Sequence, residues 1–405
     1  MGGGEWGVLR LAMNTVNELH KSTGGTVHPA MAGADWAKKA RLGRVVTDSR
    51  EVEQGDLFWA LVGPNHDGSE FAGEAFQRGA AGVVAGRTVD VPPGQWALVV
   101  EDSLLALHQW AKTRRSRFTG TVIAVTGSVG KTTTREMIRA VLKTRLSGTA
   151  SPKNYNNHVG VPLSMLNMEL EDDYVVLEIG ASARGEIAAM AELCRPTIGV
   201  ITSVADAHLG GFGSRQAIAE AKAELLAALP ADGHAVLADD PWLRRLARRY
   251  QVPVTWTGRG PECQVTASDV HWSQGKLEFR VAGCSFCVPV WGRHHVNSVL
   301  IAVAVGPMMG FDAEEVAAAL ETFDPVPMRC EVMEVRGATI INDTYNASPA
   351  AMRAALDLLR DFEAHGRRIF VAGDMGQLGD ESVVLHRRLG QEVVTHSGAD
   401  LLIAC

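Results

Sequence analysis

At 405 residues, with 46% hydrophobic and 21% charged side chains, the chain has a globular composition and is too long for one compact core. The formal net charge is −7 and the charges are interspersed, which argues against a surface that binds nucleic acid. No apolar run approaches the roughly 20 residues that span a bilayer. We therefore expect a cytoplasmic protein with no membrane span.

The six cysteines are scattered along the chain, and the only close pair is Cys284 and Cys287. This pair has no second pair or histidine set at zinc-ligand spacing. In a strand the two side chains would point to opposite faces. We expect no metal role for this pair.

The first part of the chain predicts a small α/β domain that ends near residue 118. Residues 1 to about 43 carry little pattern and include a frayed end. Two short apolar strands then surround the turn at 53–56, and helices follow at about 71–78 and 103–115. Thr47, Ser49 and Arg50, at the end of the first of these strands, either grip a nucleotide diphosphate or cap a turn.

Residues 121–142 predict a strand, a glycine-rich loop and a helix. Gly127 and Gly130 let the backbone approach a polyphosphate, whose charge meets the free N–H groups of the new helix. Lys131 would face the β- and γ-phosphates, and Thr132 would offer its hydroxyl to Mg2+. The common longer phosphate-loop pattern fails because residue 125 is Val, and the shorter T-G-S-V-G-K-T takes its place. We predict a mononucleotide site.

The next loop, at 151–158, gathers three asparagines and His158 ahead of an apolar helix. Such a loop either binds a polar ligand or bonds its own backbone, and the residues alone leave both open.

Two polar residues follow the next apolar strands. Glu178 ends the strand at 174–178, and His208 comes after the strand at 198–204. Because ligands bind at the carboxyl ends of parallel strands, we predict that both side chains converge on the phosphate loop. Taken by itself, His208 is better interpreted as a core histidine whose ring nitrogens form hydrogen bonds than as a ligand-binding residue. Lys222 lies on a predicted helix at 217–229, where a lysine is usually solvated.

The remaining segments predict further strands and a third domain. Strands are expected at 235–238, 276–281 and 285–290, and an apolar helix ends the stretch 292–305. Residues 324–335 read as a proline-stiffened connection. Ser348 is the expected N-cap of a helix with Pro349 in its first turn. The buried stripe of that helix is expected to be Met352, Ala355, Leu356 and Leu359, with strands after it at 368–375 and 399–405.

Taken together, these segments resemble the Mur ligases, ATP-dependent amide-forming enzymes of peptidoglycan synthesis. The match runs from about residue 44 to the end. Its marks are V-T-D-S-R, G-D-L-F-W-A-L, T-G-S-V-G-K-T, K-N-Y-N-N-H-V-G-V-P, L-E-I-G-A, A-H-L-G-G-F-G-S, A-K-A-E, G-R-H, M-R-C-E, N-D-T-Y-N-A-S-P and A-G-D-M-G-Q-L-G. The segments N-Y-N-N and D-T-Y-N-A-S-P are similar to those of the members that add D-alanyl-D-alanine, rather than of the enzymes one step earlier.

The resemblance implies a three-domain α/β architecture: residues 1–118 would bind the UDP end of the substrate, 119–325 would form a parallel-sheet ATPase domain, and 326–405 would form a partial Rossmann-like domain. The implied reaction joins D-alanyl-D-alanine to UDP-N-acetylmuramoyl-tripeptide through an acyl phosphate. ATP, two Mg2+ sites and a carbamylated lysine are implied as well, and we expect a monomer.

The resemblance also implies residue roles. Lys131, Lys222 and His208 would be catalytic, and Thr132, Glu178, His208 and carbamylated Lys222 would bind Mg2+. ATP would be held by Gly127, Ser128, Val129, Gly130, Lys131, Thr132, Thr133, His295, Ser298, Arg329 and Asp343. Substrate would be held by Thr47, Ser49, Arg50, Asn156, Asn157, Tyr345 and Asn346.

One motif departs from the family. Near the adenine the family has G-x-H-N-x-x-N, but here His295 and Ser298 replace the two asparagines, unless Asn297 substitutes from one position away.

Two alternatives stay open. One is another amide ligase of this architecture, such as an earlier Mur enzyme or a folylpolyglutamate synthase. The other is a nucleotide-binding protein that has lost ligation. The second rests on the expectation that the third domain is truncated, since only three convincing strands follow the connection and the last strand has no covering helix.

Overall fold

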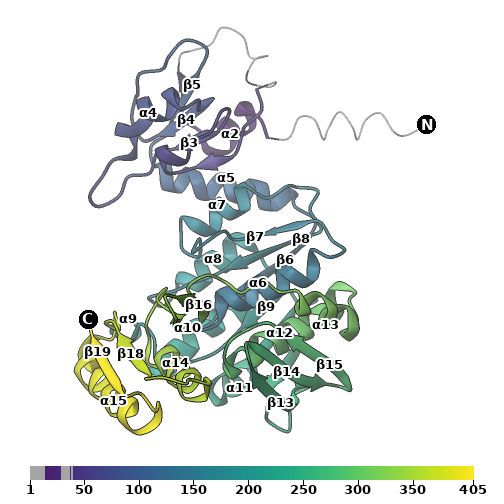
Figure 1. Cartoon of the computed structure of the whole chain (residues 1–405). Helices are drawn as coiled ribbons and strands as arrows, with labels where there is room; N and C mark the ends of the chain where they lie inside the picture. The colour runs from purple at the N-terminus through teal and green to yellow at the C-terminus, as the bar shows by residue number, and fades with distance from the viewer. Residues whose placement is uncertain (1–13, 29–36, 38–39) are drawn as a thin grey trace. The chain divides into compact units, whose positions relative to one another are not determined.

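The computed structural model describes residues 14–28, 37 and 40–405, and the chain divides into two compact units (Figure 1). One unit contains residues 1–119 and 158–171, and the other contains residues 120–157 and 172–405. Both carry parallel strands with helices, so the predicted α/β class is confirmed. The expected domain limits near 118 and 325 stay a prediction. Within the described residues, no helix has the length and apolar character needed to cross a bilayer.

The first unit is built on a five-stranded sheet in the order β1-β5-β4-β3-β2. All neighbouring strands are parallel except β1 and β5. Its strands are β1 Thr26–His28, β2 Val45–Val46, β3 Leu57–Trp59, β4 Gly82–Ala85 and β5 Trp96–Val99, and its helices are α2 Val16–Thr23, α4 Ala72–Gln77, α5 Ser103–Arg117 and α7 Gly160–Leu166, with 3-10 turns at Ser49–Glu51 and Gly68–Phe71.

Helix α2 lies within residues 1–43, where no helix was predicted. Its start is marked by a capping box. The Thr15 side chain accepts a hydrogen bond from the backbone N–H of Glu18, and the Glu18 side chain accepts one from the backbone N–H of Thr15. This Thr-x-x-Glu spacing is a local signal that was present in the sequence.

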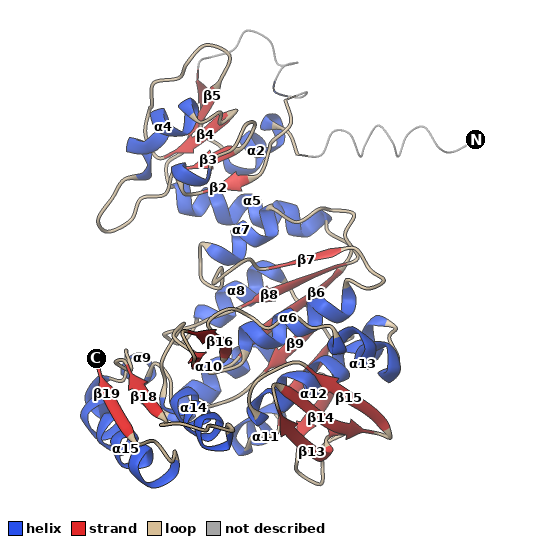
Figure 2. Cartoon of the chain, in the orientation of Figure 1, coloured by secondary structure: helices blue, strands red, loops and turns tan. Residues whose placement is uncertain are grey.

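The second unit is built on a seven-stranded parallel sheet in the order β12-β11-β10-β9-β6-β8-β7. Figure 2 labels the neighbouring strands β9, β6, β8 and β7 of this sheet. Its strands are β6 Thr121–Thr126, β7 Gly148–Ala150, β8 Tyr174–Glu178, β9 Ile198–Ile201, β10 His234–Ala238, β11 Val254–Gly258 and β12 Val265–Thr266. Its helices are α6 Lys131–Leu142, α8 Glu186–Cys194, α9 Leu209–Phe212, α10 Arg215–Ala227, α11 Pro241–Ala247, α12 Val296–Val305 and α13 Ala313–Glu321.

Strand β6 is buried on both faces, which explains its unbroken apolar run. Ile123 and Val125 belong to the core that includes α6 and α12. Val122 and Ala124 are also fully buried, and they point to the opposite face because side chains alternate along a strand. That face meets α10, which packs on α8 and α11. Strand β6 therefore lies at the centre of a sheet covered by helices, and its carboxyl end lies between those of β8 and β9.

Three smaller strand groups complete the unit: the antiparallel β13 Ser268–Ser273, β14 Lys276–Val281 and β15 Cys284–Val288, the hairpin of β16 Glu331–Val335 and β17 Ala338–Asn342, and the parallel pair of β18 Ile369–Ala372 and β19 Leu401–Ala404. Helices α14 Pro349–Asp361 and α15 Ser382–His396 accompany the last pair, and 3-10 turns lie at Arg293–His295, Gly306–Met309 and Gly379–Glu381.

The predicted cap of α14 is confirmed. The Ser348 hydroxyl accepts from the backbone N–H of Ala351, and Pro349 is the first helical residue. Of the predicted stripe, Leu356 is fully buried, and the other three residues pack against the same small core. Residues 331–335, expected to lie in a connection, form one strand of a hairpin instead.

Candidate functional site

The loop between β6 and α6 is fixed by close contacts with the end of β9. A Cβ atom on Gly127 would lie 1.9 Å from Thr202 Oγ1, and Gly130 has a φ of +83°, so both positions require glycine. The backbone N–H of Ser128 donates to Ser203 O at 3.1 Å, and that of Val129 donates to Ser203 Oγ at 2.9 Å. The segment after β9 thus holds the loop in a set shape at the N-terminus of α6.

Lys131 folds back over this loop. Its Nζ donates to the backbone carbonyl of Gly127 at 2.9 Å. Burial lowers the pKa of Lys131, while the negative charge of Glu178 acts in the opposite direction. A cation therefore lies where the loop would receive phosphate oxygens.

Glu178, 2% exposed, accepts hydrogen bonds from three side chains on two segments, α6 and the asparagine loop. Thr132 Oγ1 and Arg135 Nη1 donate to Oε2 at 2.9 and 3.0 Å, and Asn156 Nδ2 donates to Oε1 at 2.9 Å. The carboxylate and the Thr132 hydroxyl are the hard oxygen ligands that Mg2+ prefers, so the residues fit a magnesium site. Sequence reasoning missed Arg135, because an arginine on an amphipathic helix gives no signal that it will be buried.

Lys222 is 3% exposed, so its interpretation as a solvated lysine is wrong. Burial lowers the pKa of its amine to about 7, and the nearby charge of Lys131 acts in the same direction. A large fraction of this amine is therefore neutral at physiological pH.

His208 is half-buried and adopts a left-handed backbone, with a φ of +55°, immediately before α9. Burial lowers the pKa of its imidazole, and a hydrogen bond between Nδ1 and Gln377 Oε1 opposes that shift. Gln377 lies in the loop after β18, within the A-G-D-M-G-Q-L-G motif, although no role was predicted for it.

The hairpin β16–β17 brings a further polar group to the same place. The Arg329 guanidinium lies 4.0 Å from the ring centroid of Tyr345, a cation–π contact. The backbone N–H of Cys330 donates to Asp343 Oδ1 at 3.2 Å, while burial raises the pKa of the Asp343 carboxyl.

All the predicted site residues of the second unit line one cavity of about 700 Å3. They are Gly127, Ser128, Val129, Gly130, Lys131, Thr132, Thr133, Asn156, Asn157, Glu178, His208, Lys222, His295, Ser298, Arg329, Asp343, Tyr345 and Asn346. The predicted convergence of Glu178 and His208 on the phosphate loop is thus seen in the structure, and their roles stay predictions.

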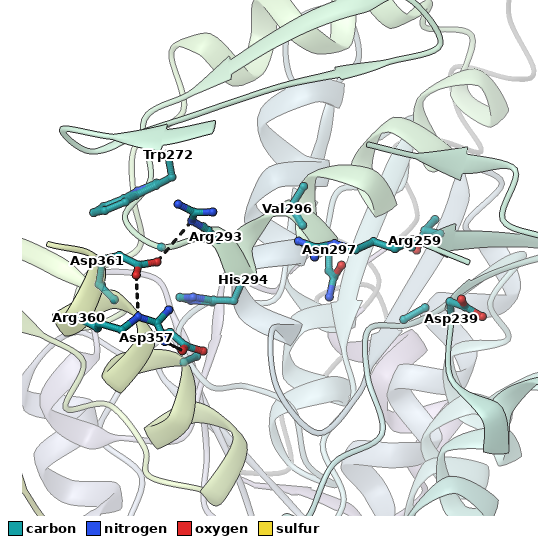
Figure 3. A pocket seen from close by; sticks show the side chains of 16 residues that line it. Asp239, Arg259, Trp272, Arg293, His294, Val296, Asn297, Asp357, Arg360 and Asp361 are labelled. Carbon is teal, nitrogen blue, oxygen red and sulfur yellow. Dashed lines mark hydrogen bonds and ion pairs between the residues drawn. The ribbon is translucent and has the colours of Figure 1, made fainter. Parts of the chain in front are cut away.

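A second cavity, of about 500 Å3, lies beside the first (Figure 3). Asn297 and His294 line both cavities. Ser298, in contrast, is buried, and its hydroxyl accepts from Thr134 Oγ1 at 3.0 Å. Asn297 is therefore the more accessible polar group at the start of α12, one position from the residue expected from the motif.

The three predicted substrate residues of the first unit lie around a 3-10 turn after β2. Ser49 Oγ donates to Glu74 Oε2 at 2.8 Å, and Arg50 pairs with Asp48 at 2.7 Å. The turn is capped by Asp48, rather than by Thr47 or Ser49. Arg50 remains largely exposed, with 77% of its side chain accessible.

Comparisons with known proteins agree with this geometry. The Mur ligase middle domain model matches residues 125–306, and the model described as Mur ligase, glutamate ligase domain matches residues 328–405. The UDP-N-acetylmuramoyl-tripeptide–D-alanyl-D-alanine ligase of Bacillus subtilis is 38% identical over 351 residues, which cover 85% of this chain and 76% of the relative. The Escherichia coli protein of that name is 33% identical, and the match covers 92% of this chain and 82% of the relative.

Solved structures agree as well. A crystal structure of MurF from Acinetobacter baumannii is similar with a TM-score of 0.85 and 30% identity, covering 96% of this chain and 85% of that one. The MurF ligase of Thermotoga maritima, solved in complex with ADP, has a TM-score of 0.76 and 31% identity, covering 89% and 87%.

Proposed function

Because this chain belongs to the Mur ligase family, we propose that it adds D-alanyl-D-alanine to UDP-N-acetylmuramoyl-tripeptide, using ATP, in peptidoglycan precursor synthesis. The observation that carries the proposal is the single cavity in which the phosphate loop, Glu178, His208, Lys222 and the Arg329–Asp343 segment meet. ATP and nucleotide-linked precursors are cytoplasmic compounds, so the proposed location is the cytoplasm.

The reaction needs an activated carboxyl group, because a carboxylate is a poor electrophile at neutral pH. Transfer of the γ-phosphoryl group of ATP to the tripeptide carboxylate gives an acyl phosphate, and the amine of D-alanyl-D-alanine then displaces phosphate. The loop N–H groups and Lys131 are suited to neutralise the charge that develops on the transferring phosphoryl group.

Mg2+ would be held at the first site by Thr132 and Glu178, with His208 as a further ligand directly or through water. Bound there, the ion supplies positive charge that stabilises the phosphoryl oxygens. Arg135 and Asn156 orient the Glu178 carboxylate through their hydrogen bonds.

Lys222 is proposed to be carbamylated. Its neutral amine is able to react with CO2, and the product is a carboxylate suited to a second Mg2+. Burial keeps the amine neutral and therefore reactive, and a bound Mg2+ would neutralise the charge of the carbamate.

The other ligands are assigned by motif. Arg329 and Asp343 would contact ATP, and Asn156, Asn157, Tyr345 and Asn346 would contact the peptide substrates. The UDP end would bind at Thr47, Ser49 and Arg50, where the exposed guanidinium of Arg50 suits a diphosphate.

The test is an assay of ADP release over a matrix of acids and amines. The acids are UDP-N-acetylmuramoyl-tripeptide with diaminopimelate or lysine as its third residue, the UDP-linked precursors of the earlier steps, and a folate. The amines are D-alanyl-D-alanine and single amino acids. ADP release only with a tripeptide and D-alanyl-D-alanine is expected. Turnover with a different pair, or with none, would overturn the proposal.

A further inference from the structure

Three side chains with ligand atoms for a soft metal meet in the wall of the large cavity. One ring nitrogen of His294, one ring nitrogen of His295 and the sulfur of Cys330 all lie within 4.8 Å of one another. It is the only cluster of this kind in the part of the chain that the structure describes. It includes none of Thr132, Glu178 and His208, the residues assigned to the magnesium site.

The spacing suits tetrahedral zinc. His294 Nε2 lies 3.8 Å from Cys330 Sγ, and the two imidazole centroids are 4.1 Å apart. Typical Zn–N and Zn–S bonds at a tetrahedral angle place nitrogen and sulfur about 3.6 Å apart. His294 Nε2 and Cys330 Sγ are therefore within a few tenths of an ångström of that spacing, and a side-chain rotation of His295, whose ring nitrogen lies within 4.8 Å of both, would complete the set.

The surroundings fit an ion that enters from solvent. His295 and Cys330 are buried, with 6% and 4% of their surface exposed, whereas His294 is exposed. Among the described residues, no hydrogen bond is formed by the buried ring of His295. The Asp343 carboxylate, which accepts from the Cys330 backbone, places a negative charge beside the sulfur. Burial and this charge both raise the pKa of the Cys330 thiol, whereas the same charge attracts a divalent cation to the cluster.

We propose that His294, His295 and Cys330 bind one thiophilic divalent cation of the zinc class, and that this cation inhibits nucleotide binding. Imidazole and thiolate ligands select zinc over magnesium, so the ion used for catalysis would not compete. A fourth position stays open to water, since the cluster provides three ligands.

The inhibition follows from where the ligands lie. The two histidines belong to the stretch matched by the middle-domain model, and Cys330 belongs to the stretch matched by the glutamate ligase domain model. All three also line the cavity that contains the phosphate loop. A bound cation would therefore join two segments across the wall of the nucleotide cavity and occupy His295, which is one of the predicted ATP contacts. This inhibitory part rests on the proposed function, whereas the binding part does not.

The binding test uses the untagged full chain with Co2+ as a spectroscopic substitute for zinc, in a reductant that does not bind metals. One equivalent of Co2+ is expected to give a thiolate-to-cobalt charge-transfer band and intense tetrahedral d–d bands, which excess Mg2+ leaves unchanged and Zn2+ abolishes. Cys330→Ser should lose the charge-transfer band, and His294→Gln should weaken Co2+ binding at least tenfold. The matched control Cys287→Ser, at a half-buried cysteine outside the cluster, should keep both signals.

No charge-transfer band in the wild-type protein, or a band that persists in Cys330→Ser, would overturn the proposal. His294 is exposed, so His294→Gln should fold, and its melting temperature checks this independently of Cys330.

The inhibitory part is tested by the effect of Zn2+ on ADP affinity, measured directly by calorimetry with excess Mg2+. Zn2+ should weaken ADP binding at least tenfold in the wild type and far less in Cys330→Ser. Equal sensitivity in both would refute inhibition through this cluster. Neither experiment requires ligation. A protein without ligase activity could therefore still be shown to bind the cation, and a protein that does not bind the cation could still be shown to be a ligase.

Discussion

The guanidinium of Arg135 and the carboxylate of Glu178 form an ion pair inside the second unit, with 4% and 2% of the side chains exposed and 3.0 Å between Nη1 and Oε2. The pair joins the first turns of α6 to the end of β8. Arg135 also donates to the backbone carbonyl of Lys153, so it connects the asparagine loop as well.

Replacing Arg135 should destabilise the fold. Arg135→Met leaves the buried Glu178 carboxylate without its cation, which should lower the free energy of unfolding by about 3–5 kcal/mol. The measurement is urea unfolding. Arg139→Met is the matched control on the same helix. Arg139 is half-exposed and pairs with Glu136 on the helix surface, so its replacement should change the free energy of unfolding by less than about 0.5 kcal/mol. Equal losses in the two variants would contradict a structural role for the buried pair.

Lys131 should be required for turnover. Lys131→Ala removes a charge stabiliser from the phosphate loop and should lower ADP release with UDP-N-acetylmuramoyl-tripeptide and D-alanyl-D-alanine by about a hundredfold or more. Lys143→Ala, at the exposed end of the same helix, should retain activity. Near-normal turnover in Lys131→Ala would show that the phosphate-loop assignment is wrong.

Carbamylation of Lys222 predicts chemical rescue. Lys222→Ala should be inactive and should regain part of its ADP release when acetate or formate is added, because a small carboxylate can occupy the position of the carbamate. The wild-type protein should also incorporate isotope-labelled bicarbonate, detected by NMR as one carbamate signal that Lys222→Ala lacks. Lys153→Ala, an exposed lysine, is the control. An active Lys222→Ala enzyme, or a wild-type protein without the carbamate signal, would show that Lys222 does not act as a carbamate.

The buried amine of Lys222 predicts a pH dependence of stability. Burial lowers its pKa from 10.5 to about 7, so between these values the unfolded chain binds a proton that the folded chain does not. Raising the pH above 7 therefore stabilises the folded chain, by up to about 1.4 kcal/mol per pH unit. Urea unfolding in CO2-free buffer should show this slope for the wild type and a shallower one for Lys222→Met. Parallel slopes would indicate that the amine is not desolvated in the folded chain.

Asn297 should contribute mainly to ATP binding, and Ser298 mainly to the stability of the fold. Asn297→Ala removes a polar group that lines both cavities and should weaken ATP binding, with little change in melting temperature. Ser298→Ala leaves the buried Thr134 hydroxyl without its acceptor and should cost about 1–3 kcal/mol of stability, with a smaller effect on ATP affinity. Calorimetric titration with ATP and urea unfolding of both variants decide between them. The reverse pattern would favour Ser298 as the nucleotide contact.

Several features of the fold could be predicted because their signals are local. The glycine loop before α6, the Ser348–Pro349 start of α14 and the apolar run of β6 are each encoded within a few neighbouring residues. The meeting of Glu178 and His208 near the phosphate loop required one further rule, that the carboxyl ends of parallel strands lie at one edge of a sheet.

By itself, the sequence thus determined the α/β class, the glycine loop before α6 and the predicted site residues that line the large cavity. Only the tertiary structure decided that Lys222 is buried, that Arg135 pairs with Glu178, that Gln377 contacts His208, and that Cys330 lies beside two histidines 35 and 36 residues earlier in the chain. The physical reason is that a cap or a glycine turn depends on the backbone of its neighbours, whereas burial and pairing depend on which distant segments pack together. A charged residue on a helix has the same local pattern whether it faces water or a buried carboxylate.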